Sequence, residues 1–199
     1  MNPVETLYAL TGKEAPGRSP EFTAAHILIA LRIIVERGPG RQQLSGDLWL
    51  GEGTVRNLLR RLTEEGLVSS TRRGVALTAD GERLLAELRS VIRGRPVPRS
   101  RLTVGEHNYA VVVKGGASKV RLGVEQRDRA LISGALGATT LVMDGGLKAP
   151  ALTDVVEDRL SDAILELGAA DGDAVVIGTG GSPFWAELGA YSAGLEMLC

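Results

Sequence analysis

The chain has 199 residues, of which 44% are hydrophobic, so it is long enough to bury a core and to form one or two domains; we expect two. It holds no run of about 18 apolar residues, and its start lacks the basic and apolar segments of a signal peptide, so we expect a cytoplasmic protein without a membrane partner. Because the one cysteine is Cys199, no disulfide can form within the chain, and we also expect no metal site.

The net charge of −1 conceals an uneven distribution of charged residues along the chain. Residues 1–101 hold 16 Lys and Arg against 11 Asp and Glu, which gives +5, whereas residues 102–199 hold 7 against 13, which gives −6. An acidic surface repels nucleic acid. We therefore expect the first half to bind DNA and the second half to dimerise or to sense an effector.

The N-terminal part begins with residues 1–18, which we interpret as a leader. A helix then begins at Ser19-Pro20, a typical N-cap and first helical residue, and runs to about Arg37. Residues 38–40 are Gly-Pro-Gly and end this helix. His26 lies among its apolar residues, so we interpret it as a structural residue and not as a ligand.

The next segment has the pattern of a helix-turn-helix. A short helix from Arg41 to about Leu48, a turn at residues 50–52 and a second helix that ends at Gly66 are expected. The second helix has an apolar stripe, formed by Val55, Leu58, Leu59 and Leu62. Its polar candidates for DNA contacts are Gly53, Thr54, Arg56, Asn57, Arg60 and Arg61. Arginine and asparagine side chains read guanine and adenine edges in the major groove, so this helix is predicted to bind duplex DNA.

Two short extended segments, 67–71 and 75–78, follow the second helix and predict a small hairpin, the wing of a winged helix. Its tip carries Arg72 and Arg73, which we expect to contact phosphates. A closing helix after the wing has apolar residues at helical spacing, namely Leu84, Leu85, Leu88 and Ile92. The segment 19–93 is thus predicted to be a winged helix-turn-helix domain.

This segment resembles archaeal winged-helix transcriptional regulators. The most specific parts of the resemblance are Gly51-x-Gly53-Thr54-Val55-Arg56-x-Leu58-Leu59-x-x-Leu62-x-x-x-Gly66-Leu67 and Leu77-Thr78-x-x-Gly81. The resemblance implies a DNA-binding fold.

The prolines and arginines of residues 94–101 predict a semi-rigid linker, and its arginines either follow a phosphate backbone or keep the segment solvated. The remaining residues, 102–199, are predicted to form a small acidic α/β domain, so the whole chain is of the α+β or α/β class. The expected strands are 108–113, 139–143 and 173–177, and the expected helices are 125–135, 155–167 and 183–198. This alternation favours a parallel sheet, unless residues 144–146 turn the second strand into a hairpin with residues 147–150, which makes the sheet mixed.

Two glycine-rich segments, residues 114–123 and 178–183, follow strands of this domain and open helices. Such loops present backbone N–H groups to anions, although tight turns need glycines without any ligand. If the strands are parallel, both loops lie at one edge of the sheet and converge. The candidate residues for a small anionic effector are Lys114, Gly115, Gly116, Lys119, Arg121, Gly178, Gly180, Gly181 and Ser182.

Over its whole length the chain resembles a family of two-domain archaeal proteins that are predicted transcriptional regulators. In the second domain the resemblance rests on residues 112–115, 123–128, 137–141 and 176–178. It implies a DNA-binding role but no ligand, cofactor or catalytic residue.

We therefore predict a non-catalytic transcriptional regulator that binds double-stranded DNA, needs no cofactor and forms a homodimer. The dimer contact is expected on the closing helix or on the apolar helix 183–198, unless both are core. Two alternatives stay open. One is an enzyme that acts on a phosphate-containing small molecule and carries a regulatory winged helix, and the other is an adaptor whose winged helix binds protein.

Overall fold

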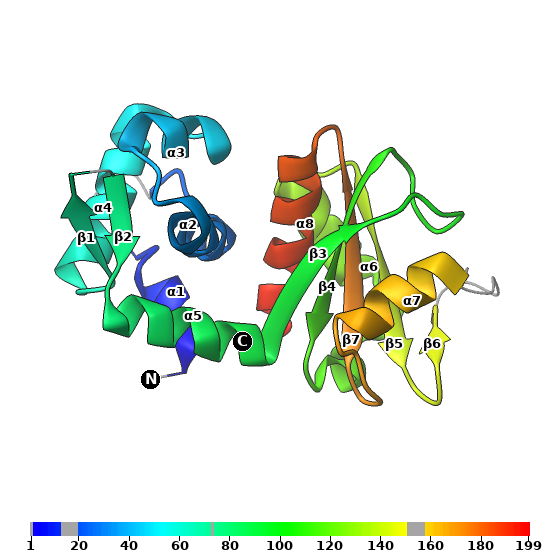
Figure 1. Cartoon of the computed structure of the whole chain (residues 1–199). Coiled ribbons are helices and arrows are strands. Elements are labelled where there is room, and N and C mark those ends of the chain that lie inside the picture. The colour runs from blue at the N-terminus through cyan, green and yellow to red at the C-terminus, as the bar shows by residue number, and fades with distance from the viewer. Residues whose placement is uncertain (1, 13–19, 73, 151–157) are drawn as a thin grey trace. The chain divides into compact units, whose positions relative to one another are not determined.

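The computed structural model describes residues 2–12, 20–72, 74–150 and 158–199. Figure 1 shows two compact units, Met1–Arg89 and Ser90–Cys199. The first is mainly helical and the second carries an antiparallel sheet with helices, which confirms the expected α+β class. Among the described residues, no helix is both long enough and apolar enough to cross a membrane.

The first unit consists of helices and one hairpin. Its elements are α1 (Pro3–Ala9), α2 (Ala24–Arg37), α3 (Arg41–Asp47), α4 (Glu52–Glu64), β1 (Val68–Thr71), β2 (Gly74–Leu77) and most of α5 (Ala79–Val91). The strands β1 and β2 pair antiparallel and form the predicted wing hairpin. Helix α2 packs against α1 and β2, and α3 packs against α4.

Helix α1 corrects the expectation that residues 1–18 are a leader. Asn2 caps this helix by accepting a hydrogen bond from the backbone N–H of Val4 at 3.0 Å. Val4, Leu7 and Leu10 are buried, so the helix contributes to the core. A spacing of three residues places these side chains on one helix face, but seven residues are too few for a clear amphipathic pattern. Residues 13–19 lie outside the described part.

The turn between α3 and α4 centres on Trp49, one residue before the expected turn. Trp49 has a φ of 53°, which is unusual for a residue other than glycine. Two hydrogen bonds close the turn, because the Ser45 Oγ donates to the Leu50 carbonyl at 2.5 Å and the Leu50 N–H donates to the Ser45 carbonyl at 3.2 Å. Helix α4 then begins at Glu52.

The second unit is a five-stranded sheet with helices on both faces (Figure 1). Its elements are β3 (Ile92–Val97), β4 (His107–Val113), η1 (Gly116–Lys119), α6 (Val124–Ile132), β5 (Gly137–Met143), β6 (Leu147–Lys148), α7 (Asp158–Glu166), β7 (Ala174–Gly180) and α8 (Pro183–Glu196). The three expected strands and three expected helices of this unit are present with shifted ends. Residues 155–157 of the expected helix 155–167 lie outside the described residues.

The direction of the strands differs from the prediction. The sheet order is β3-β4-β7-β5-β6, and all of these neighbours pair antiparallel, so the expectation of parallel pairs is wrong. Strands β4 and β5 do run in the same direction, but β7 lies between them and runs against both. The hairpin that residues 144–146 were expected to allow is present as β5–β6.

The Arg/Pro segment is not a free linker, which corrects the expectation for residues 94–101. Its first part is edge strand β3, and Pro96 is tolerated there because an edge strand has one unpaired side. The Arg93 guanidinium donates to the carbonyls of Leu167 and Gly168, and Arg95 pairs with Glu166 at 2.5 Å. These two arginines therefore bind the C-terminal end of α7.

The boundary between the units also changes the charge distribution. Met1–Arg89 holds 12 Lys and Arg against 11 Asp and Glu, and Ser90–Cys199 holds 11 against 13. The net charges are therefore +1 and −2, because the arginines of residues 93–101 belong to the second unit. Any electrostatic attraction of the first unit to DNA must come from local placement of its arginines.

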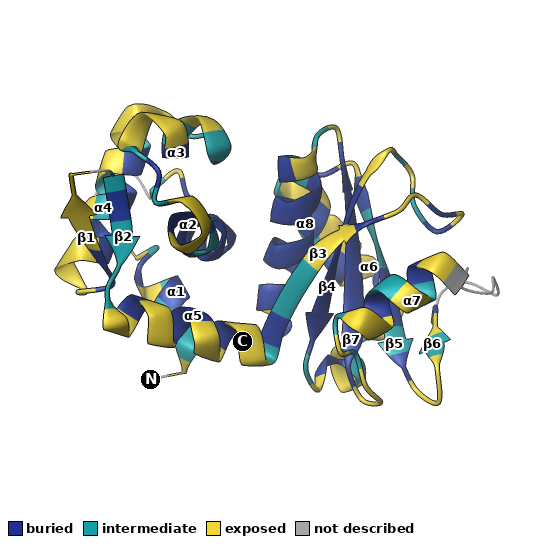
Figure 2. Ribbon diagram, viewed as in Figure 1, coloured by how far each residue is buried: buried dark blue, intermediate teal, exposed yellow. Residues whose placement is uncertain are grey.

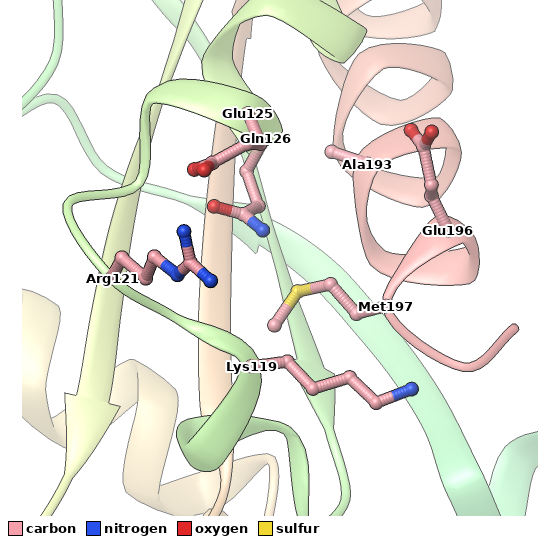
Figure 3. Close-up of a pocket in the computed structure, with 7 residues that line it drawn as sticks. All are labelled: Lys119, Arg121, Glu125, Gln126, Ala193, Glu196 and Met197. Carbon is pink, nitrogen blue, oxygen red and sulfur yellow. The ribbon is translucent and has the colours of Figure 1, made fainter.

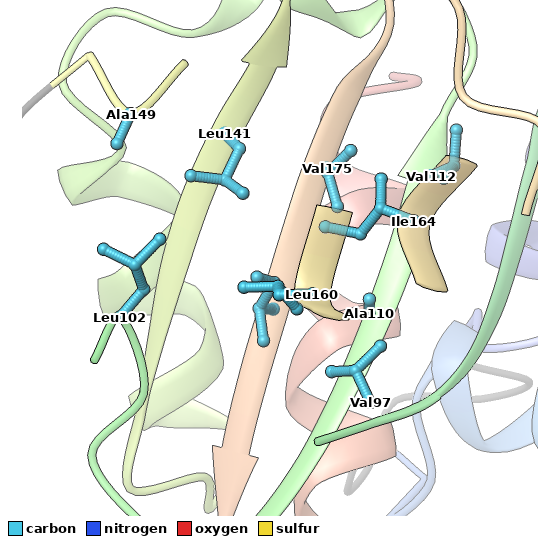
Figure 4. Packing of buried hydrophobic residues seen from close by; sticks show 10 residues of the cluster. Val97, Leu102, Ala110, Val112, Leu141, Ala149, Leu160, Ile164 and Val175 are labelled. Carbon is cyan, nitrogen blue, oxygen red and sulfur yellow. The ribbon is translucent and has the colours of Figure 1, made fainter. Parts of the chain in front are cut away.

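Both faces of the sheet are covered, and strands β4 and β7 are buried apart from His107 at the start of β4 (Figure 2). On one face, Leu160 and Ile164 of α7 pack with alternate strand residues such as Val112 and Val175 (Figure 4). On the other face α8 lies along β4 and β7, with α6 beside it. The apolar faces that were candidates for dimer contacts are core. The buried residues are Leu84, Leu85, Leu88, Ile92, Leu188, Tyr191 and Leu195.

Candidate functional site

Helix α4 separates an apolar face from a polar face, as predicted. Val55, Leu58 and Leu62 are buried, whereas Leu59 is only half-buried. Burial of these side chains fixes the rotation of the helix about its axis. Arg56 is exposed and makes no hydrogen bond or ion pair with any residue in the described part of the chain.

Asn57 and Arg60 form a linked pair on the same helix. The Arg60 guanidinium donates to the Asn57 Oδ1 at 2.9 Å and pairs with Glu64 at 2.7 Å. The Arg60 side chain is still 44% exposed. Exposed ion pairs at this spacing contribute only about 0.3–0.5 kcal/mol, so a phosphate or a base edge can displace Glu64 at low cost.

Arg61 does not lie on the exposed face, which corrects the prediction that it contacts DNA. Its side chain is buried and donates to the carbonyls of Leu10 and Gly12, both at 2.7 Å. Its guanidinium carbon lies 5.6 Å from the centroid of the Phe22 ring. A helical wheel could not show this, because the contacting segment lies about fifty residues earlier in the chain.

The other predicted DNA contacts lie around the start of α4 and at the hairpin. Gly53 is exposed, and a side chain added there meets nothing within 4 Å, so the helix start is open to a large ligand. The Thr54 hydroxyl donates to Glu21 at 3.0 Å. Arg72 is exposed at the hairpin tip, and Arg73 lies outside the described residues.

Trp49 is a candidate that the sequence analysis missed. It is 62% exposed and directly precedes the two residues that lead into α4. A bulky residue with a positive φ carries a conformational cost of about 1–3 kcal/mol. The signal in the sequence is a tryptophan between Leu48 and Leu50, just before the expected turn, which the helical pattern does not explain.

The two glycine-rich segments do not converge, so the predicted anion site that combined them is wrong. In the β4–β7 pairing Val113 is opposite Ala174, and His107 is opposite Gly180. The two segments therefore leave the sheet at opposite ends, about 20 Å apart for strands of this length. The error follows directly from the assumption of parallel strands.

Lys114 and Gly115 hold a buried carboxylate. The Lys114 Nζ lies 2.5 Å from Asp173, and the backbone N–H groups of Gly115 and Ala170 donate to the same carboxylate at 3.0 and 2.9 Å. Burial raises the pKa of Asp173, but these hydrogen bonds outweigh it, so the pKa lies below its ordinary value. Gly116 is buried against Val113 and Ala174. These three predicted ligands are structural.

Gly178 and Gly180 are required for packing. Both lie within β7, and a side chain at Gly178 meets the Ala186 carbonyl of α8 at 2.4 Å. A side chain at Gly180 meets the Ala186 nitrogen at 2.3 Å. Gly181 is exposed and Ser182 is the N-cap residue of α8, but its hydroxyl makes no capping hydrogen bond.

The last two predicted ligands, Lys119 and Arg121, do line a pocket. Its volume is about 250 Å³, and its other walls come from the start of α6 and the end of α8 (Figure 3). Glu125 and Gln126 lie on the α6 side, and Glu196 lies on the α8 side. Within the described residues there is no cluster of three or more metal-ligating side chains.

Comparisons with known proteins give separate matches within the first and the second unit of the chain. Residues 104–197 match the family model "Domain of unknown function (DUF4443)", and residues 26–83 match the model "PH0730-like, N-terminal domain". A solved structure, "Hypothetical protein PH0730 from Pyrococcus horikoshii OT3", is 29% identical, with a TM-score of 0.72 over 89% of this chain and 93% of that chain. No curated protein matches the chain. These matches fit a two-domain archaeal protein.

Proposed function

We propose that this chain is a cytoplasmic transcriptional regulator that binds double-stranded DNA through its first unit. One observation carries the proposal: α4 buries Val55, Leu58 and Leu62 and leaves Arg56, Asn57 and Arg60 on its accessible side. A helix of this kind, preceded by a tight turn and followed by a hairpin with an exposed arginine, fits the major groove with the hairpin along the backbone.

The proposed roles differ between these residues. Arg56 and Asn57 read base edges, because they lie in the first half of α4, where a recognition helix approaches the bases. Arg60 and Arg72 neutralise phosphates. The open surface at Gly53 allows the helix start to approach the DNA backbone closely. With a net charge of only +1 on the first unit, we expect weak non-specific binding. The salt dependence should be shallow, because Arg60 and Arg72 neutralise few phosphates and so release few counterions.

The proposal is tested by selecting duplexes from a random pool with the full chain and measuring their dissociation constants at several salt concentrations. We expect Arg72→Ala to weaken selected and unrelated duplexes equally and to lower the salt slope by about one. Arg56→Ala should instead reduce discrimination between the two duplexes by roughly 1–3 kcal/mol.

Arg89→Ala is the matched control, because it removes an exposed arginine from α5, outside the helix-turn-helix and the hairpin. It should leave both affinities unchanged. A pool that yields no enriched duplex, or equal losses for all three variants, would overturn the proposed DNA-binding role and would favour the adaptor alternative.

We further propose a homodimer, because a single recognition helix covers too few base pairs for useful specificity. The surface for it must be sought outside the core faces of α5 and α8. The exposed apolar residues Val104, Ile132 and Leu136 are candidates, since segments 104–105 and 136–137 approach each other. Light scattering should give twice the mass of the chain, and Ile132→Asp should shift it toward the monomer.

The proposed role is not catalytic. The enzyme alternative requires a phosphate site formed by the two glycine-rich segments together with Lys114, Lys119, Asp128 and Asp144. Those segments lie at opposite ends of β4 and β7, and Lys114 is paired with Asp173, so this support is removed.

A further inference from the structure

The pocket in the second unit carries charges of both signs on a small surface. Lys119 is the last residue of η1, and Arg121 lies in the segment that follows it. Glu125 and Gln126 line the pocket from the start of α6, and Glu196 and Met197 line it from the end of α8 (Figure 3). Its volume of about 250 Å³ suits a small metabolite. Two cations and two carboxylates surround the same space.

Two of these charges are not neutralised by the protein. Arg121 and Glu125 are exposed, and neither forms a hydrogen bond or an ion pair with another residue in the ranges that the structure describes. The other two are partly engaged, since Lys119 donates to the carbonyl of Cys199 at 3.0 Å and Glu196 pairs with Arg129 at 3.3 Å. The pocket thus keeps one available group of each sign.

Gln126 adds an independent indication of a ligand. The residue is only 7% exposed, and its buried Oε1 accepts no hydrogen bond. An unpaired buried carbonyl oxygen has lost its hydrogen bonds to water without replacement, so such atoms are uncommon. Figure 3 shows the Gln126 and Arg121 side chains pointing toward one another across the pocket. A small rotation of the Gln126 side chain would bring this Oε1 to the surface of the pocket, where an N–H donor of a ligand would satisfy it.

We propose that this pocket binds a free α-amino acid. Arg121, assisted by Lys119, binds the carboxylate, and the ammonium group donates to Glu125 and to the Gln126 Oε1. Met197 contacts the side chain of the ligand, so an apolar amino acid is expected. A dianion such as phosphate would be repelled by Glu125 and Glu196, and a simple amine would meet Lys119 and Arg121.

The inference does not depend on DNA binding, and its test contains no DNA. Standard L-amino acids are titrated into the full chain by calorimetry, and one that binds is compared with two analogues of the same side chain. For L-leucine these are 2-hydroxy-4-methylpentanoate, which lacks the ammonium group, and 3-methylbutylamine, which lacks the carboxylate. Each analogue should bind about tenfold more weakly or worse, because it loses charge-assisted hydrogen bonds.

Arg121→Gln and Glu125→Gln identify the two ends of the site. Each should weaken the amino acid about tenfold, and Arg121→Gln should leave the affinity for the amine unchanged or higher. Both side chains are exposed, so the variants should fold, which thermal unfolding checks. Arg159→Gln and Asp162→Asn are matched controls on the exposed side of α7, and neither residue lines the pocket.

Three results would overturn the proposal. The first is the absence of amino-acid binding up to about 10 mM, a free energy of roughly 3 kcal/mol, which is too weak for a specific site. The second is an inorganic phosphate affinity equal to or higher than that of the amino acid. The third is binding that neither Arg121→Gln nor Glu125→Gln changes relative to the α7 controls.

Discussion

The ammonium group of Lys114 lies 2.5 Å from the carboxylate of Asp173, whose side chain is only 4% exposed. Asp173 directly precedes β7, and Lys114 directly follows β4, so this pair joins two adjacent strands at one end of the sheet. The pair stabilises the loop after β4, which the sequence pattern predicts to bind an anion.

We predict that Lys114→Met lowers the free energy of unfolding by roughly 1–3 kcal/mol, because Asp173 then keeps its backbone donors but loses its counter-charge. Urea unfolding at neutral pH measures the effect. Lys148→Met is the control, since it removes the lysine of an exposed pair with Asp144 and should leave stability almost unchanged. Equal losses in the two variants would contradict a special role of the buried pair.

A second prediction compares Arg61 and Arg56, which lie on the same helix. Arg61 is buried, whereas Arg56 is exposed. Arg61→Met should lower the free energy of unfolding by roughly 1–3 kcal/mol, since two carbonyls lose their charged donor. Arg56→Met should change it by less than about 0.5 kcal/mol. In DNA titrations of the folded protein the order should reverse, with Arg56→Met the weaker binder. If Arg61→Met weakens DNA binding more, its assignment as a structural residue is wrong.

His26 makes stability sensitive to mild acid. The Thr23 N–H donates to its Nδ1 at 3.2 Å, and burial lowers the pKa of His26 from 6.5 to about 4. Between pH 6.5 and about pH 4, therefore, His26 binds a proton in the unfolded chain but stays neutral in the folded chain. His26 does not reduce the free energy of unfolding well above pH 6.5. As the pH drops toward 4, this free energy falls by up to about 3 kcal/mol.

His26→Asn tests this, because an amide oxygen can accept from the Thr23 N–H but does not titrate. Unfolding free energies of both proteins are measured between pH 7 and about pH 4. The variant should lose less stability than the parent over this range. Parallel curves would show that other groups cause the acid sensitivity.

The features that the sequence predicted correctly are local in the chain. The stripe Val55, Leu58 and Leu62 and the hairpin 68–77 depend on side chains within a few residues of each other, and a periodic pattern reports them directly. The insertion of β7 between β4 and β5 depends on pairing between distant segments, which no period encodes. The same holds for the candidate site, since Arg61 and Lys114 bind Leu10 and Asp173, which are distant in the chain.

Gly178 and Gly181 separate packing from ligand binding. Gly178→Ala should lower the free energy of unfolding by roughly 1–3 kcal/mol. The added methyl group meets the Ala186 carbonyl at 2.4 Å, so α8 must move. Gly181→Ala meets nothing within 4 Å and lies outside the glycines with positive φ, so it should be tolerated. Thermal unfolding of the two variants gives the comparison. If Gly178→Ala is as stable as Gly181→Ala, the close approach of α8 to β7 is not what requires the glycine, and a ligand at that strand end would have to be considered again.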